Sequence, residues 1–224
     1  RTEGLDFLEH AAGWLRDFLP STVNEVLFVP YAGVTKTHYD FVEQVTPVFA
    51  KLGATVTGLH RAHDLVAAIR NAQAIVVGGG NTWNLLRELR AHRLVLPAIR
   101  NRVLAGVPYI GWSAGSNIAC PTIMTTNDMP ICDPGGFDAL ALVPFQINPH
   151  YLHGNPPGET REERIREFGV LHPDSWVVGL REGTGLHVEG TSVKLLGEAQ
   201  CRVFRATQEP RELSSADDLS FLLE

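Results

Sequence analysis

The order of apolar runs and helical patterns is the feature that most constrains the fold of this 224-residue chain. Short apolar runs of strand length alternate with segments whose apolar residues recur at helical spacing. Strands are expected at residues 26–30, 54–59, 74–77 and 107–111, and helices at 5–19, 37–52, 64–71, 83–92 and on to 104. Apolar strands that alternate with helices are typical of a parallel sheet covered on both faces. The pattern therefore predicts an α/β fold.

The second half of the chain has a different character. Residues 125–157 are rich in Pro, Gly, Asn and Asp and lack periodicity, and long irregular segments in compact domains are often functional. A helix is expected near 162–168, followed by short strands between glycine-containing turns over 176–206. With 44% hydrophobic and 20% charged residues and no linker-like stretch, we expect one domain spanning residues 1–224 rather than two small ones.

Charge and cysteine content narrow the classes of partner and compartment. The chain has 19 basic and 25 acidic residues, a net charge of −6, and no basic cluster, which disfavours nucleic acid and acidic membranes as partners. Its three cysteines show no C-x-x-C spacing, so neither a disulfide framework nor a zinc knuckle is indicated. Reduced thiols are typical of a cytoplasmic protein, and the apolar runs are too short to cross a bilayer.

Gly111-Trp112-Ser113-Ala114-Gly115 is the sharpest chemical signal. It follows an expected strand and precedes a plausible helix, which is the context of a nucleophile elbow, where a serine sits on a strained turn and glycines leave room for the backbone. Ser113 is therefore the candidate nucleophile. Ser116 is a weaker candidate, because it should lie inside the helix.

Gly78-Gly79-Gly80-Asn81-Thr82 also joins an expected strand to an expected helix. Backbone N–H groups of such a loop could form an oxyanion hole. A phosphate-binding loop is less favoured, because neither G-x-G-x-x-G nor a Walker lysine is present. A purely structural glycine turn is the remaining alternative.

His150, in Asn148-Pro149-His150, is the candidate general base, because the proline stiffens the approach to the ring. With His153 it would instead be half of a metal site, although an H-x-x-H pair without a third ligand is weak evidence for metal. Two carboxylates are candidates for orienting His150, Asp128 and Glu182. Glu182 directly follows an apolar strand, where catalytic side chains of parallel sheets often emerge.

With these residues assembled, the chain resembles the peptidase E (aspartyl dipeptidase) family over nearly its whole length. The most specific matching blocks are Phe28-Val29-Pro30-Tyr31-Ala32-Gly33-Val34-Thr35, Val77-Gly78-Gly79-Gly80-Asn81-Thr82, Tyr109-Ile110-Gly111-Trp112-Ser113-Ala114-Gly115, Cys120-Pro121-Thr122-Ile123, Thr125-Thr126-Asn127-Asp128-Met129-Pro130-Ile131 and Gln146-Ile147-Asn148-Pro149-His150. Several such blocks in one order are far more specific than any single motif.

The resemblance implies a flavodoxin-like three-layer α/β sandwich related to glutamine amidotransferase domains. We expect a mostly parallel central sheet and a short antiparallel β extension at the C-terminus. It also implies hydrolysis of dipeptides with an N-terminal aspartate, without metal or cofactor, by a homodimer. Ser113 falls on the family nucleophile, His150 on its base, and both Glu182 and Asp128 on acidic members of the site.

The family likeness extends to binding groups. Gly80 and Ala114 fall where backbone donors form the oxyanion hole. Arg161, in Glu159-Thr160-Arg161-Glu162, is the candidate reader of the substrate side-chain carboxylate, because its fork meets a carboxylate bidentately. A solvated arginine at a helix start is the competing interpretation. Asn81 is a second substrate-binding candidate.

The chain departs from the family in two respects. No apolar strand precedes Leu5, and we expect a trimmed N-terminus rather than a protein that lacks this strand. Residues 151–158 and the tail beyond Glu182 follow the family pattern only loosely, which leaves the leaving-group preference open. Three other functions compete. A cyanophycinase-like peptidase would share the elbow and cut β-aspartyl-arginine links. An α/β-hydrolase esterase has the order Ser, acid, His, which Asp128 would satisfy and Glu182 would not. An inactive binding module could keep the same fold.

Overall fold

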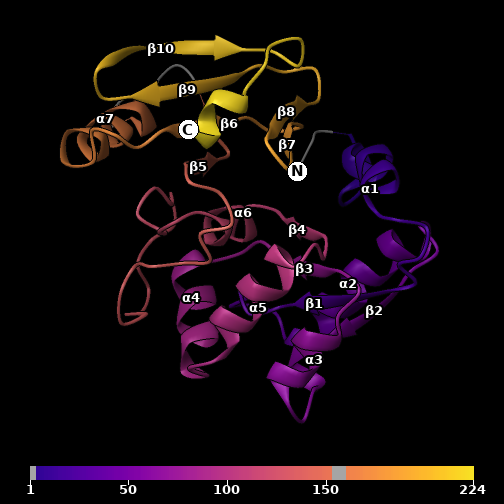
Figure 1. Cartoon of the computed structure of the whole chain (residues 1–224). Helices are drawn as coiled ribbons and strands as arrows, with labels where there is room; N and C mark the ends of the chain where they lie inside the picture. Colours follow the sequence, from indigo (N-terminus) through magenta and orange to yellow (C-terminus); the bar gives the residue numbers. More distant parts are fainter. Residues whose placement is uncertain (1–3, 153–159) are drawn as a thin grey trace.

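The computed structural model describes residues 4–152 and 160–224 and has two four-stranded sheets (Figure 1). The first is parallel, in the order β2-β1-β3-β4. Its strands are β1 (Glu25–Val29), β2 (Thr55–Gly58), β3 (Ile75–Val77) and β4 (Tyr109–Gly111). They lie where the apolar runs predict them, which confirms the α/β class.

Alternate residues of these strands face two different cores. Val26, Phe28 and Val76 pack with α2 (His38–Ala50) on one face. Leu27 and the other residues that alternate with them pack on the opposite face, against α3 (Leu65–Asn71), α4 (Thr82–Ala91), α5 (Val95–Leu104) and α6 (Ala114–Ala119). The central strands β1 and β3 are buried on both faces, which explains why they read as apolar runs, whereas the edge strand β2 is largely exposed and carries two threonines.

The second sheet has the order β10-β9-β6-β5 and lies above the first in Figure 1. β5 (Gln146–Pro149) and β6 (Val177–Leu180) pair in parallel, whereas β9 (Cys201–Arg205) and β10 (Gln208–Leu213) pair antiparallel. β7 (Gly185–Glu189) and β8 (Ser192–Leu196) form a separate hairpin, and α7 (Arg161–Leu171) connects β5 to β6. The antiparallel pairs formed by β7 with β8 and by β9 with its neighbours are the C-terminal extension that we expected.

Several expected boundaries were wrong. The N-terminal helix is shorter than residues 5–19, because a 3₁₀ turn at Glu9–Ala11 precedes α1 (Ala12–Phe18). The interval 125–157 is not wholly irregular, since it contains β5. That strand lacks an apolar pattern because two of its buried residues, Gln146 and Asn148, are polar. Gln146 Nε2 donates a hydrogen bond to Thr122 Oγ1, and Asn148 Nδ2 donates one to the carbonyl of Thr125.

Of the helices in the described residues, none has the length and apolar character needed to cross a membrane. All three cysteines, Cys120, Cys132 and Cys201, are free thiols.

Candidate active site

The site lies where strand ends from the two sheets meet. Gly78 follows β3, Ser113 follows β4, His150 follows β5, and Glu182 lies two residues beyond β6. Parallel strands present their carboxyl ends at the same edge of a sheet, the usual place for ligands in α/β proteins. In Figure 1, β5 lies just above α6, the helix that follows the turn at Ser113.

Ser113 occupies a strained turn between β4 and α6. Its backbone angles, φ 54° and ψ −114°, lie in a region that L-residues rarely adopt. Gly115 makes this turn sterically feasible, because a Cβ there would lie 2.3 Å from the carbonyl oxygen of Val77. The Ser116 hydroxyl donates to the carbonyl of Gly111 at 3.2 Å within the same turn.

Ser113, His150 and Glu182 form a continuous chain of contacts. Ser113 Oγ lies 2.9 Å from His150 Nε2, and His150 Nδ1 is hydrogen-bonded to Glu182 Oε1. The side chains of His150 and Glu182 are 46% and 43% exposed, so the pair is open to solvent and to a small substrate. A carboxylate on the far ring nitrogen fixes the tautomer that leaves Nε2 free to accept a proton from the serine.

The electrostatics of Glu182 favour its charged form. Burial alone would raise the pKa of Glu182, but the hydrogen bond and the charge of His150 contribute to an opposing effect, and the net pKa lies below the ordinary value. Glu182 is therefore a carboxylate at neutral pH and can stabilise an imidazolium at His150.

The backbone around His150 is held by specific hydrogen bonds. His150 has φ 57°, and the N–H of Tyr151 donates to the carbonyl of Leu180 at 3.0 Å. Asn127 Nδ2 donates to the carbonyl of Pro149 at 2.8 Å, directly before the histidine. The first bond ties the backbone after His150 to β6, the strand that leads to Glu182, and the second ties the backbone before it to the segment that carries Asn127.

The glycine loop after β3 lies against the serine. A Cβ on Gly79 would be 2.9 Å from Ser113 Cβ, so only glycine permits this approach. Gly80 has φ +140°, and a Cβ there would lie 2.2 Å from the carbonyl oxygen of Ala32. Within the part of the chain that the structure describes, the N–H groups of Gly80 and Ala114 have no hydrogen-bond acceptor. Both remain available to an oxyanion.

The two carboxylates that we considered as partners of His150 lie in different places. Glu182 contacts the imidazole, whereas Asp128 Oδ2 accepts hydrogen bonds from Thr82 N at 2.7 Å and Thr82 Oγ1 at 2.6 Å. Asp128 thus binds the first turn of α4, just after the glycine loop. Among the described residues it makes no hydrogen bond to His150.

Asn81 holds the same loop. It is the N-cap of α4, with its Oδ1 accepting from Asn84 N at 3.0 Å and its Nδ2 donating to the Met129 carbonyl at 3.0 Å. These contacts show how Asn81 connects the glycine loop to the segment that carries Asp128. Direct substrate binding by Asn81 stays a prediction.

Arg161 is the first residue of α7, and part of its guanidinium group is buried. Its Nη1 is buried and has no hydrogen-bond partner among the described residues. Burial lowers the pKa of Arg161, Arg164 lowers it further, and Glu182 opposes this, which places Arg161 within electrostatic range of the site carboxylate. A buried guanidinium nitrogen without an acceptor is costly unless a ligand supplies one.

The residues that sequence reasoning missed are polar groups that support β5. Asn117 Nδ2 and Thr125 Oγ1 both donate to the carbonyl of Ile147, at 2.8 and 3.1 Å. Asn148 Nδ2 donates to the carbonyl of Thr125 at 2.8 Å. The density of Thr and Asn in residues 125–128 was the available signal, since buried polar side chains need such partners.

The alternative metal site at His150 and His153 is not described in full, because His153 lies outside the described residues. Within residues 4–152 and 160–224, the structure contains no group of three or more His, Cys, Asp or Glu side chains that could hold a metal ion.

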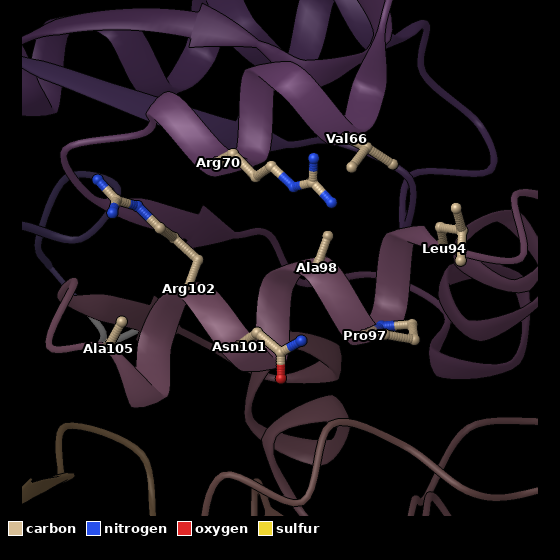
Figure 2. A pocket seen from close by; sticks show the side chains of 8 residues that line it. All are labelled: Val66, Arg70, Leu94, Pro97, Ala98, Asn101, Arg102 and Ala105. Atoms are coloured by element: carbon tan, nitrogen blue, oxygen red, sulfur yellow. The ribbon is translucent and has the colours of Figure 1, made fainter.

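A cavity of about 330 Å³ lies elsewhere, between α3 and α5 (Figure 2). It is lined by Val66, Arg70, Leu94, Pro97, Ala98, Asn101, Arg102 and Ala105. None of these residues is a nucleophile or a general base of moderate pKa, and Figure 1 shows α3 at the opposite end of the molecule from β6. The cavity therefore contains none of the candidate catalytic residues, which lie at the carboxyl ends of β4, β5 and β6.

The fold and the site define a class: α/β proteins in which a serine on a strand-to-helix turn meets a histidine–carboxylate pair at a sheet edge. The family model of peptidase family S51 matches residues 1–196. The chain belongs to this family and is a peptidase.

Named relatives agree with this assignment. The chain is 47% identical over 224 residues to Peptidase E of Nostoc sp. (strain PCC 7120), covering 99% of this chain and 92% of that one. It is 49% identical over 205 residues to Peptidase E of Salmonella typhimurium (strain LT2), covering 88% and 89%. The crystal structure of a peptidase from an acI-B1 actinobacterium has a TM-score of 0.72 at 14% identity, covers 95% of this chain and 92% of that chain, and supports the fold.

Proposed function

We propose that this peptidase is a serine dipeptidase that hydrolyses dipeptides with an N-terminal aspartate through an acyl-enzyme. The observation that carries the proposal is the contact chain from Ser113 Oγ through His150 to Glu182. A hydroxyl, an imidazole and a carboxylate in this order are the parts that acyl transfer from a serine requires.

In the first step Ser113 Oγ attacks the peptide carbonyl carbon while His150 Nε2 takes the hydroxyl proton. Glu182 stabilises the resulting imidazolium. The tetrahedral oxyanion accepts hydrogen bonds from the N–H groups of Gly80 and Ala114, each contributing about 3 kcal/mol to lowering the barrier. His150 then protonates the departing amino acid.

In the second step a water molecule attacks the acyl-enzyme, His150 takes its proton, and Ser113 regains its own. The N-terminal aspartate is released. No metal or cofactor takes part in this proposed sequence.

Selectivity for aspartate rests on Arg161. Its buried Nη1 lacks an acceptor among the described residues, and the side-chain carboxylate of the substrate would supply one. Glutamate adds a methylene that shifts the carboxylate, and asparagine lacks the charge. We therefore expect kcat/KM to be highest for Asp-X, with Glu-X and Asn-X lower by about 10-fold or more.

The deciding experiment compares Asp-Leu, Glu-Leu, Asn-Leu and β-Asp-Arg as substrates of the wild type and of Ser113→Ala. The proposal requires that Asp-Leu be cleaved fastest and that Ser113→Ala lose this activity. Preference for β-Asp-Arg would indicate a cyanophycinase-like peptidase instead. Failure of wild-type Ser113 to react with a small fluorophosphonate would favour an inactive binding module.

The role of Arg161 has a matched control on the same helix turn. Arg161→Ala should raise KM for Asp-Leu, whereas Arg164→Ala removes the same charge from an exposed position and should leave KM nearly unchanged. Equal KM values for Arg161→Ala and the wild type would remove Arg161 from the binding site. A cytoplasmic homodimer is part of the proposal, and light scattering of the purified protein tests the dimer.

A further inference from the structure

Three of the segments that supply a site residue also supply a neighbouring residue to one charged cluster. His150 is followed by Tyr151, Arg161 by Glu162, and Glu182 is preceded by Arg181. The charged cluster consists of Tyr151, Glu162, Arg181, Arg202 and Glu212.

Glu212, on β10, holds the residue that precedes Glu182. Its two carboxylate oxygens accept hydrogen bonds from Arg181 Nη1 at 2.6 Å and Nη2 at 2.8 Å, and Nη1 also donates to the carbonyl of Gln200 at 2.6 Å. Bidentate pairing fixes both the position and the orientation of the guanidinium. Arg181 is thereby anchored to β10 and to the segment before β9.

The same carboxylate reaches the segment that carries Arg161. Glu212 Oε1 accepts from Arg202 Nη1 at 3.1 Å, and Arg202 Nη2 lies 3.6 Å from Glu162 Oε1. Glu162 in turn accepts a hydrogen bond from the Tyr151 hydroxyl at 3.1 Å. The connection therefore runs from β10 through β9 to the first turn of α7 and to the residue after His150.

The side chains of the charged cluster are partly shielded from solvent, which strengthens their electrostatic interactions. The side chains of Arg181, Arg202 and Glu212 are 22%, 18% and 30% exposed. The hydrogen bond with Glu212 raises the pKa of Arg181, and the hydrogen bond from Arg181 lowers the pKa of Glu212 despite burial, so both stay charged. Networks with bidentate geometry contribute more than isolated surface pairs.

We infer that Glu212 is a positioning residue, which aligns Glu182 through Arg181 and Arg161 through Arg202 and Glu162. This inference rests on the proposed function, because it assigns the aligned residues their roles. Small displacements of such groups slow reactions strongly, up to about 100-fold for 1 Å.

The test compares Glu212→Gln with Glu209→Gln. Glu209 lies on the same strand, is exposed, and has no hydrogen bond or ion pair with a described residue, so it controls for the loss of one charge. The first measurement is the rate constant with which a small fluorophosphonate labels Ser113. We expect Glu212→Gln to lower it about 10-fold or more and Glu209→Gln to leave it unchanged.

This readout separates positioning from simple loss of folded protein, which reduces the amount of labelled enzyme but not its rate constant. The second measurement is KM for Asp-Leu, which Glu212→Gln should raise in the wild-type background and raise no further in Arg161→Ala. Wild-type values for both the labelling rate constant and KM would overturn the inference.

The two proposals fail differently. If the wild type labels rapidly but cleaves no Asp dipeptide, the substrate proposal fails while the labelling rate constant still decides the role of Glu212. A wild-type Ser113 that does not label at all overturns both.

Discussion

Removing the charge of Glu182 should impair catalysis, whereas removing the charge of Asp128 should impair stability. Glu182→Gln keeps the side-chain shape but removes the charge next to His150 Nδ1, so the correct tautomer is no longer enforced. Loss of this function in serine triads lowers kcat by about 10⁴-fold, and the open position of Glu182 leads us to expect about 10²- to 10⁴-fold. Stability should change little, because the side chain is 43% exposed.

Asp128→Asn should instead destabilise the protein. The Asp128 carboxylate accepts two short hydrogen bonds from Thr82, at 2.7 and 2.6 Å. The amide oxygen of the variant can accept the same hydrogen bonds, but it lacks the negative charge that strengthens them. Charged hydrogen bonds contribute about 1.5–3 kcal/mol, so the loss should lie in this range. For a chain of this length that corresponds to a Tm lower by about 3–12 °C.

Two measurements on each variant decide the matter: Tm by differential scanning fluorimetry, and kcat for Asp-Leu per active site titrated with fluorophosphonate. We expect Glu182→Gln to lose kcat at nearly constant Tm, and Asp128→Asn to lose Tm at nearly constant kcat per site. The opposite pairing of defects would refute this reading of the contacts and make Asp128 the catalytic carboxylate.

Three further changes test the supports of the site. Gly80→Ala should prevent folding or abolish activity, because the new Cβ would lie 2.2 Å from the Ala32 carbonyl oxygen at a φ of +140°; circular dichroism and the Asp-Leu assay check this. Asn127→Ala should lower kcat by about 10-fold while KM changes little, because the carbonyl before the base loses its donor. Glu212 has a pKa below its ordinary value of 4.5, so its contribution to stability is complete above that pH and is lost as pH falls through the folded-state pKa. In urea titrations at about pH 6 and about pH 3, the wild type should therefore lose more unfolding free energy than Glu212→Gln.

The local parts of the site could be predicted from the sequence. The turn at Ser113 and the glycine loop ending at Gly80 are each encoded by a few consecutive residues between a strand and a helix. Their chemistry follows from backbone sterics, which short motifs report well. The parallel sheet was predictable for a similar reason, since burial on both faces makes its central strands β1 and β3 apolar.

The choice between Glu182 and Asp128 could not be made from the sequence, because it depends on strand register. β5 and β6 pair in parallel with Pro149 opposite Leu180, so the residues just beyond the two strands approach each other. β5 itself was missed, since its buried amides hide the apolar pattern. Without that strand, the parallel pairing that brings Glu182 next to His150 could not be proposed. The positioning role proposed for Glu212 could not be predicted from the sequence either, because its contacts join residues far apart in the chain.

The strain at Ser113 provides a test that separates backbone from side-chain effects. Ser113→Ala and Ser113→Gly both remove the nucleophile, but only glycine adopts φ 54° and ψ −114° without steric strain. Relief of about 1–3 kcal/mol of strain, less about 0.5–1 kcal/mol for the greater freedom of unfolded glycine, leaves up to about 2.5 kcal/mol in favour of Ser113→Gly. Its Tm should exceed that of Ser113→Ala by up to about 10 °C. A lower Tm for Ser113→Gly would mean that the backbone strain at this turn is smaller than about 1 kcal/mol and would refute the reasoning.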